Sequence, residues 1–433
     1  MEMEESTRAA GASSPAVGHR VFLAASLAAI NNLAFGYDVG VISGSLADMA
    51  STLDLSTLEQ EAATSGLNFL AGFGALLVSG NLLDRLGRRA TLLISSLLLL
   101  AGAAVVCLAQ DFGVLLLGRV LQGLGSGCSW SACSVYITEI APKQYRGALV
   151  AIADISINVG ILVGYGLDYV VNVSVDDANV RWRVAMAFSV TMPLLYTLLY
   201  PWVPETPRWL VMRGRDTEAA AVMRWFTGLG EAEAAEAVAS IAAAASGDRG
   251  VSWAGLLDRR AVPPGLLVLT CFLGLGQQLT GTEAILYYTP SIVNECPHGV
   301  DDPPAGCTAA DAVFLINLSV GGCKLVGELI AVALVESAGR RRTLAASNLL
   351  VSALVFTIAL KFLLGWSTLA GAASLCLVML FFSLGPGPSA GRKPAGGLSS
   401  DPGLAPWRPR RLAAPAHPRQ TVAAVARQLA KAA

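Results

Sequence analysis

Two charged residues stand inside long apolar stretches of the chain. Asp38 lies in the segment Gly36-Tyr-Asp-Val-Gly40, and Arg119 lies in a separate apolar run. A carboxylate can accept a proton, whereas a guanidinium stays positively charged. Ionisable groups in such surroundings are costly and are usually functional. The sequence therefore predicts that the two side chains neutralise each other. A static buried ion pair is the alternative.

Polar side chains also occur in the later apolar stretches. Gln277 and Gln278 are adjacent amides, and an amide both donates and accepts hydrogen bonds, as a hydroxylated ligand requires. The alternative is polar contact between packed helices. Lys324 and Glu328 are four positions apart and could neutralise each other on one helix.

The elements that hold these residues are predicted to be membrane-spanning helices. The chain is 54% hydrophobic and 14% charged, with a mean hydropathy of +0.58, which is too apolar for a soluble protein. About 20 apolar residues cross a bilayer. Ten candidate spans fit this length, and they lie near 20–44, 65–83, 90–109, 113–138, 148–170, 183–203, 263–290, 312–335, 343–364 and 367–388. The fold class is an all-α membrane protein.

The spans fall into two sets with a polar break between them. The predicted organisation begins with a cytoplasmic N-terminus (1–19), a six-helix bundle (20–203) and a cytoplasmic helical linker (204–262). It continues with an incomplete bundle of about four helices (263–388) and a basic Pro/Ala-rich tail (389–433), which we expect to be disordered. No cleaved signal peptide is expected. Most Lys and Arg outside the spans fall on one side, which places the N-terminus and the linker in the cytoplasm.

A repeated segment indicates two related halves. Asp84-Arg-Leu-Gly-Arg-Arg-Ala-Thr-Leu92 recurs as Glu336-Ser-Ala-Gly-Arg-Arg-Arg-Thr-Leu344, each copy after the second span of its set. The second set is shorter than the first by about two helices with their loops.

Several classes of function are excluded. A net charge of −1 offers no basic surface for nucleic acid. The three histidines lie outside the spans, and no nucleophile, metal-binding or phosphate-binding motif occurs, so neither an enzyme nor a metal site is predicted. Cys296 and Cys307 share a polar loop and could form a disulfide or remain free thiols.

A set of local motifs resembles the sugar porter family of the major facilitator superfamily, over roughly residues 20–388. The motifs are Asp84-Arg-x-Gly-Arg-Arg89, Glu139-Ile-Ala-Pro142 with Arg146-Gly147, Pro204-Glu-Thr-Pro-Arg208, Gln277-Gln278 with Gly281 and Tyr287-Tyr288, and Gly385-Pro-Gly-Pro388. The resemblance implies a major facilitator fold of two six-helix bundles, here with about ten of the twelve helices.

The resemblance also implies roles for individual residues. Asp38 matches the protonation site of proton-coupled members and Arg119 its partner, which makes protons the coupling ion, with no other cofactor. Gln277, Gln278 and Tyr288 match substrate-binding positions. Asp154, Glu283 and Lys324 are charged where hexose-type members commonly have an amide, which is similar to the polyol branch. Acid groups accept strongly from the hydroxyls of a polyol or a monosaccharide.

Charged residues at the cytoplasmic helix ends form a third predicted set. Acid and arginine clusters at such positions suit a latch that breaks and reforms, and the resemblance to the family favours a role in gating. The candidates are Asp84, Arg85, Arg88, Arg89, Glu139, Arg146, Glu205, Arg208, Glu336 and Arg340. The alternative is that they are topology signals and solvated ion pairs, each worth little at a surface.

The expected function is proton-coupled transport of a polyol or monosaccharide by alternating access. A facilitative uniporter is the first alternative. A truncated, non-transporting product is the second, because the family's motifs beyond the tenth span do not follow Pro388; a reading-frame change or an alternative exon could produce this. A multi-pass location in the plasma membrane is preferred over an internal membrane. The substrate, the oligomeric state and glycosylation at Asn172 stay open.

Overall fold

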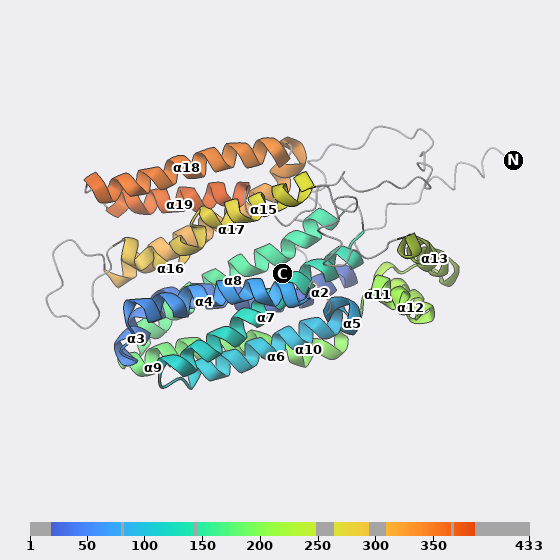
Figure 1. Cartoon of the computed structure of the whole chain (residues 1–433), viewed down its shortest axis with the longest axis horizontal. Coiled ribbons are helices and arrows are strands. Elements are labelled where there is room, and N and C mark those ends of the chain that lie inside the picture. Colours follow the sequence, from blue (N-terminus) through green and yellow to red (C-terminus); the bar gives the residue numbers. More distant parts are fainter. Residues whose placement is uncertain are drawn as a thin grey trace.

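The computed structural model is an elongated assembly of helices (Figure 1). It describes residues 19–78, 82–142, 145–247, 264–293, 309–338, 340–364 and 368–385, and it leaves out side chains at several helix ends, among them those of 333–338, 340 and 341. No β-strand occurs in these ranges. Cys296 and Cys307 lie outside the described residues, as do the termini.

The first set of helices runs from α2 to α10. Its members are α2 (His19–Ala28), α3 (Ile30–Thr52), α4 (Thr57–Leu77), α5 (Leu83–Leu86), α6 (Arg88–Cys107), α7 (Phe112–Ile140), α8 (Arg146–Ser174), α9 (Ala178–Ala187) and α10 (Thr191–Leu199), with 3-10 turns η2 (Phe188–Val190) and η3 (Tyr200–Trp202). Helices α3, α6, α7 and α8 pack closely around shared buried residues.

Three short helices follow and lie together at one end of the molecule (Figure 1). They are α11 (Pro207–Met212), α12 (Asp216–Thr227) and α13 (Glu231–Gly247). We call this end the linker end, and the opposite end, where α3 finishes and α9 begins, the far end. The helices coincide with the predicted polar linker, whose Ala/Glu-rich composition favours helix.

The second set contains α15 (Pro264–Leu279), α16 (Thr282–Ile292), α17 (Ala310–Ala338), α18 (Arg340–Leu364) and α19 (Thr368–Leu384). Helices α17, α18 and α19 pack against one another, and α16 and α17 reach the first set through α3 and α8. Within the described residues, each of the ten predicted spans falls on one helix or on a run of consecutive helices.

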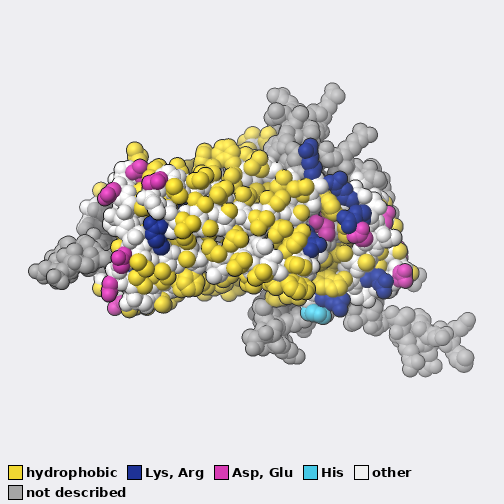
Figure 2. Space-filling view, turned by 90° about the horizontal axis from the view of Figure 1, so that it is seen from below, with side chains coloured by type: hydrophobic (Ala, Val, Ile, Leu, Met, Phe, Trp, Pro, Cys, Tyr) yellow, Lys and Arg dark blue, Asp and Glu magenta, His cyan; other side chains and the backbone are white. Residues whose placement is uncertain are grey.

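The surface has the character of a membrane protein. Figure 2 shows a hydrophobic band across the middle of one face, with charged side chains gathered at the two ends. Among the described residues, five stretches are long and apolar enough to span a bilayer: Arg88–Cys107, Arg146–Ser174, Ala178–Trp202, Asp311–Val332 and Arg342–Leu360. The pair α2–α3 makes a sixth, bent by 42°. The other predicted spans are helical but shorter or more polar.

The helix ends differ from the apolar windows predicted from the sequence. Helix α4 begins at Thr57 rather than at 65, because Ser56 and Glu59 form a capping box that starts the helix before its apolar part. The stretch 263–290 is broken into α15 and α16 at Gly281, whose φ of 71° favours glycine.

Close packing of α3 against α8 depends on small residues. A Cβ at Gly36 would collide with the carbonyl oxygen of Ile157, and a Cβ at Gly160 with that of Leu33. Glycine at these crossing points lets the two backbones approach. The close approach fixes α3, and with it Asp38, against the rest of the first set.

Candidate functional site

Asp38 lies in the centre of the first set of helices and is only 2% exposed. Its Oδ1 accepts a hydrogen bond of 2.7 Å from Ser189 Oγ, and its Oδ2 accepts one of 2.9 Å from Gln122 Nε2. Two donors from different helical elements therefore hold this carboxylate.

Arg119 is equally buried, at 1% exposed, and its donors are poorly satisfied. Nη1 donates to Gln122 Oε1 at 3.2 Å and Nη2 to Met186 Sδ at 3.6 Å, while Nε has no hydrogen-bond partner. Arg119 still acts on Asp38 electrostatically. The sequence predicted that the two charges neutralise each other; the structure joins them through the amide of Gln122, with no direct ion pair between these two side chains.

Local chain geometry explains how this cluster forms. Gln122 follows Arg119 by three positions on α7, so both side chains point to the same face of one helix. Ser189 lies in the 3-10 turn η2, which interrupts the last span of the set between α9 and α10. Short 3-10 segments inside a helix often mark functional sites.

Sequence reasoning missed both Gln122 and Ser189. A signal for Gln122 was present, since a polar amide one helical turn after a buried arginine is a natural partner. Ser189 offered no signal, because its hydroxyl could equally bond to its own helix backbone.

The predicted substrate residues lie on both sets of helices. Gln277 is partly buried and Gln278 exposed near the end of α15, and neither amide has a side-chain hydrogen bond in the described part of the chain. Asp154 on α8 and Glu283 on α16 are partly buried, and Lys324 on α17 is 8% exposed. Lys324 and the buried Glu328 share this helix, so mutual neutralisation stays a possible role for them.

Helix α16 connects the two sets through its aromatic residues. Tyr288 Oη lies 3.2 Å from Thr64 Oγ1, and Tyr287 Oη accepts a 3.2 Å hydrogen bond from Asn68 Nδ2. Tyr287 also interacts electrostatically with Glu283, Asp38 and Arg119. The predicted binding residue Tyr288 thus contacts the first set, next to a tyrosine that faces the buried charges.

A second group of contacts joins the sets near the far end. Tyr169 on α8 stacks on Phe314 of α17, with ring centroids 4.1 Å apart, and donates a 2.7 Å hydrogen bond to Asp311. One turn earlier, Tyr165 donates to the carbonyl oxygen of Leu286 at 3.1 Å. These side chains close the seam at this level.

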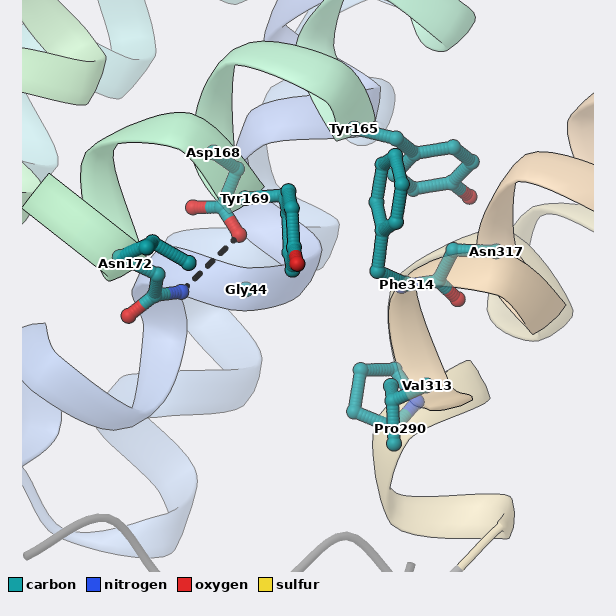
Figure 3. Close-up of a pocket in the computed structure, with 10 residues that line it drawn as sticks. Gly44, Tyr165, Asp168, Tyr169, Asn172, Pro290, Val313, Phe314 and Asn317 are labelled. Carbon is teal, nitrogen blue, oxygen red and sulfur yellow. Dashed lines mark hydrogen bonds between the residues drawn. The ribbon is translucent and has the colours of Figure 1, made fainter. Parts of the chain in front are cut away.

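A small cavity of about 90 Å³ remains beside these contacts (Figure 3). Asp168 and Asn172 line it from α8, and Phe314 and Asn317 line it from α17. None of the predicted substrate residues lines it. The volume is smaller than the usual range for ligand pockets, so this cavity is part of the closed seam.

The predicted latch residues meet partly as expected at the linker end. Arg88 Nη2 donates to Glu139 Oε1 at 2.8 Å, and Arg88 Nη1 donates to Asp84 Oδ1 at 3.2 Å. The other oxygen of Glu139 accepts from Thr206 Oγ1 at 2.6 Å. Arg88 and Glu139 are both nearly buried, which distinguishes this pair from a solvated surface ion pair.

Glu205 completes the cluster by capping α6. Its carboxylate accepts hydrogen bonds from the backbone N–H groups of Arg88 and Arg89 at 3.1 to 3.3 Å. Burial raises the pKa of Glu205 above its ordinary value, although these N–H donors and the charge of Arg88 oppose the rise. Gly87 precedes α6 with a φ of 95°, and any Cβ there would collide with the Glu205 carboxylate.

The side chains of the other latch candidates occupy different surroundings, where the structure describes them. Arg89 donates to the carbonyl oxygen of Tyr200 and lies over its ring. Arg85 and Arg146 are exposed, and Arg208 is exposed on α11. The side chains of Glu336 and Arg340 lie outside the described residues. The observed cluster therefore joins elements of the first set and the start of the linker.

Within the described ranges, no group of three or more His, Cys, Asp or Glu residues could hold a metal ion. The buried ionisable residues, the apolar band and the two sets of helices define a multi-pass helical membrane protein.

Comparison with known proteins gives the family. A family model described as "Sugar (and other) transporter" matches residues 24–391. "Probable polyol transporter 4" of Arabidopsis thaliana is 33% identical over 377 residues, covering 85% of this chain and 69% of that protein. "Facilitated glucose transporter member 12" of Macaca fascicularis is 30% identical over 364 residues, covering 83% of this chain and 56% of that protein.

The fold comparison agrees. The solved structure of the major facilitator superfamily proton:xylose symporter XylE, bound to 6-bromo-6-deoxy-D-glucose, matches with a TM-score of 0.74 at 24% identity, covering 87% of this chain and 82% of that one. The chain belongs to the sugar transporter family and has the major facilitator fold. It is a multi-pass membrane protein and a transporter rather than an enzyme.

Proposed function

We propose that this transporter couples the movement of a polyol or a monosaccharide to that of a proton. The observation that carries the proposal is the carboxyl group of Asp38, buried beside the permanently charged Arg119. A buried carboxyl that can exchange a proton is what coupling requires, and a lasting uncompensated charge inside the membrane is disfavoured. The named activity of XylE, a proton:xylose symporter of the same fold, agrees with this.

The substrate class rests on the predicted binding residues of both sets of helices. Gln277 and Gln278 offer amides with no side-chain partners among the described residues, and Asp154, Glu283 and Lys324 add charged groups that bind hydroxyls strongly. A relative is named a probable polyol transporter. A linear polyol with several hydroxyls suits such a set of donors and acceptors.

The contacts between the sets support a proposed mechanism of alternating access. The described contacts of Tyr165, Tyr169 and Tyr288 close the seam toward the far end. Opening there requires these contacts to break, while the Arg88–Glu139 cluster controls the linker end. We place the linker end in the cytoplasm, because Lys and Arg concentrate there, and we assign the chain to the plasma membrane.

Uptake of labelled sorbitol, mannitol and glucose tests the function. Cells lacking their own transporters would express the wild type or Asp38→Asn, and uptake would be measured at acidic and at neutral outside pH. Acid-stimulated accumulation is expected in the wild type. The variant is expected to lose most of it while retaining exchange of substrate across the membrane, because an amide neither gains nor loses a proton.

Asp176→Asn is the matched control, since Asp176 is an exposed carboxylate at the far end. This variant should transport like the wild type, and the surface level of all three chains would be measured in parallel. Uptake that is independent of pH and unchanged by Asp38→Asn would indicate facilitated diffusion instead. No uptake of any of the three substrates by a chain that reaches the surface would contradict the transport proposal for them.

A further inference from the structure

Gln122 occupies the space between the buried cation and the buried carboxylate. Its Nε2 donates to Asp38 Oδ2 at 2.9 Å, and its Oε1 accepts from Arg119 Nη1 at 3.2 Å. Both ends of one amide are therefore used, and the side chain is only 1% exposed. The amide dipole is oriented correctly for an ionised Asp38, with its donor toward the anion and its acceptor toward the cation.

This arrangement weakens the link between the two charges. Direct guanidinium–carboxylate hydrogen bonds are about twice as strong as those between neutral groups, and the strength of a Coulomb interaction falls with distance. An amide placed between the charges holds Arg119 and Asp38 at a fixed separation, without a direct guanidinium–carboxylate bond. Arg119, with one unpartnered Nε and one contact to a thioether, remains available for a different partner.

We propose that Gln122 is a positioning residue that holds Arg119 away from Asp38 and thereby sets the proton concentration at which Asp38 becomes protonated. The proposal rests on the proton coupling proposed above. Ser189 holds the other carboxylate oxygen but does not touch Arg119. Gln122 is therefore the side chain that bonds to both Arg119 and Asp38 and fixes the distance between the cation and the proton-binding carboxyl.

Other titratable groups around Asp38 are consistent with this role. Tyr37 on α3, Cys107 on α6 and Tyr287 on α16 interact with Asp38 electrostatically. Phenols and thiols are ordinarily neutral near pH 7. Arg119, in contrast, carries a permanent charge. Its distance from Asp38 therefore has the largest effect on the electrostatic potential at that carboxyl.

Two substitutions at this position should act in opposite directions. Gln122→Ala removes both the amide and its bulk, so Arg119 can contact Asp38 directly. This charge-assisted contact outweighs the lost Nε2–H donor and holds Asp38 ionised, so loading then needs more acid. Gln122→Glu gives Arg119 a second carboxylate and places like charges side by side, which favours protonation. We expect the protonation midpoint to shift by about one pH unit toward acid for Gln122→Ala and by about one unit toward alkali for Gln122→Glu.

The primary measurement is an infrared pH titration of the carboxyl stretch in the purified full-length protein, with Asp38→Asn used to identify the Asp38 band. The pH profile of uptake in cells is the second readout. Ser126→Ala is the matched control, because Ser126 is buried on the same helix and its hydroxyl has no hydrogen-bond partner in the described structure. It should leave the midpoint unchanged.

The outcomes separate this proposal from the proposed function. Opposite shifts of the infrared midpoint support the spacer role even if uptake proves independent of pH. A purely structural role would lower thermal stability or expression without moving the midpoint. Shifts in the same direction, or no shift in either variant, would overturn the spacer role while leaving proton coupling by Asp38 intact.

Discussion

At the scale of single residues, the structure replaces a simple ion pair by a shared network. Asp38 and Arg119 were predicted as partners from their charge and burial, and both are buried in one cluster. The sequence did not indicate that Gln122 and Ser189 hold the carboxylate. Two neutral donors stabilise the ionised form of Asp38 while leaving a route to the neutral form, which a tight salt bridge would obstruct.

Glu205 leads to a prediction about pH at the linker end. Since burial raises its pKa, the ionised form is less stable in the capped arrangement than in water. Below the ordinary carboxyl pKa, Glu205 is protonated and contributes fully to the stability of the capped arrangement. This contribution is lost as the pH rises through the raised pKa of the folded protein. The thermal midpoint of the wild type should fall over this mildly acidic window, and Glu205→Gln should remove the pH dependence from this group.

Melting curves of purified protein at several pH values would measure this effect. At acidic pH Glu205→Gln should also lower the midpoint by an amount corresponding to about 1 kcal/mol, because its amide nitrogen cannot accept the Arg89 N–H bond that Oε2 accepts. Glu231→Gln, on the exposed first turn of α13, serves as the control. A Glu205→Gln protein with wild-type pH dependence would show that other groups cause it.

At the scale of elements, glycine positions decide how closely helices cross. The α3–α8 contact places Gly36 against the backbone of Ile157, so even one methyl group has no room. Helix α4 contains Gly72, where a Cβ would meet nothing within 4 Å. Gly123 and Gly127 on α7 likewise face the backbone of α4, at Leu67 and Ala71.

We expect Gly36→Ala to destabilise the protein and Gly72→Ala to leave it unchanged or slightly more stable. The first substitution overpacks a tight crossing, a change that typically costs about 1 to 3 kcal/mol. The second adds a better helix former at an exposed position. Thermal unfolding of the two purified variants side by side would measure the difference, and equal effects would contradict the packing argument.

At the scale of the whole molecule, the two sets of helices share one cluster of buried hydrophobic residues, and aromatic and polar contacts cross the seam beside it. Tyr169 makes both a ring stack and a hydrogen bond across the seam, to Phe314 and Asp311. Such a compact contact can break and reform as one unit. This property suits a fold in which two bundles rock against each other.

Tyr169→Leu should therefore loosen the far end of the seam. Hydrogen exchange at the start of α17 is expected to accelerate, because the stack and the hydrogen bond to that helix are lost together. Tyr169→Phe keeps the stack and should show a smaller increase. Phe73→Leu, in an exposed aromatic pair on α4, is the control and should leave α17 unchanged. An unaltered exchange rate in Tyr169→Leu would show that other contacts close the seam.

The sequence alone determined the class of protein, the location of the helices and the presence of buried charges. These features are local: apolar stretches define spans by their length, and the spacing of motifs such as Asp84-Arg-x-Gly-Arg-Arg89 identifies the family. The family was confirmed by comparison with known proteins. The roles of the individual site residues stay predictions.

Only the tertiary structure decided which side chains meet. Ser189 reaches Asp38 across 151 positions, and Glu205 caps α6 across more than one hundred. The physical reason is that helices which are apolar on all sides carry little periodic signal of which face turns inward, since lipid and protein interior are both apolar. Packing between helices far apart in the chain sets the rotation of each helix about its axis. It therefore also sets the arrangement of Asp38, Gln122 and Arg119.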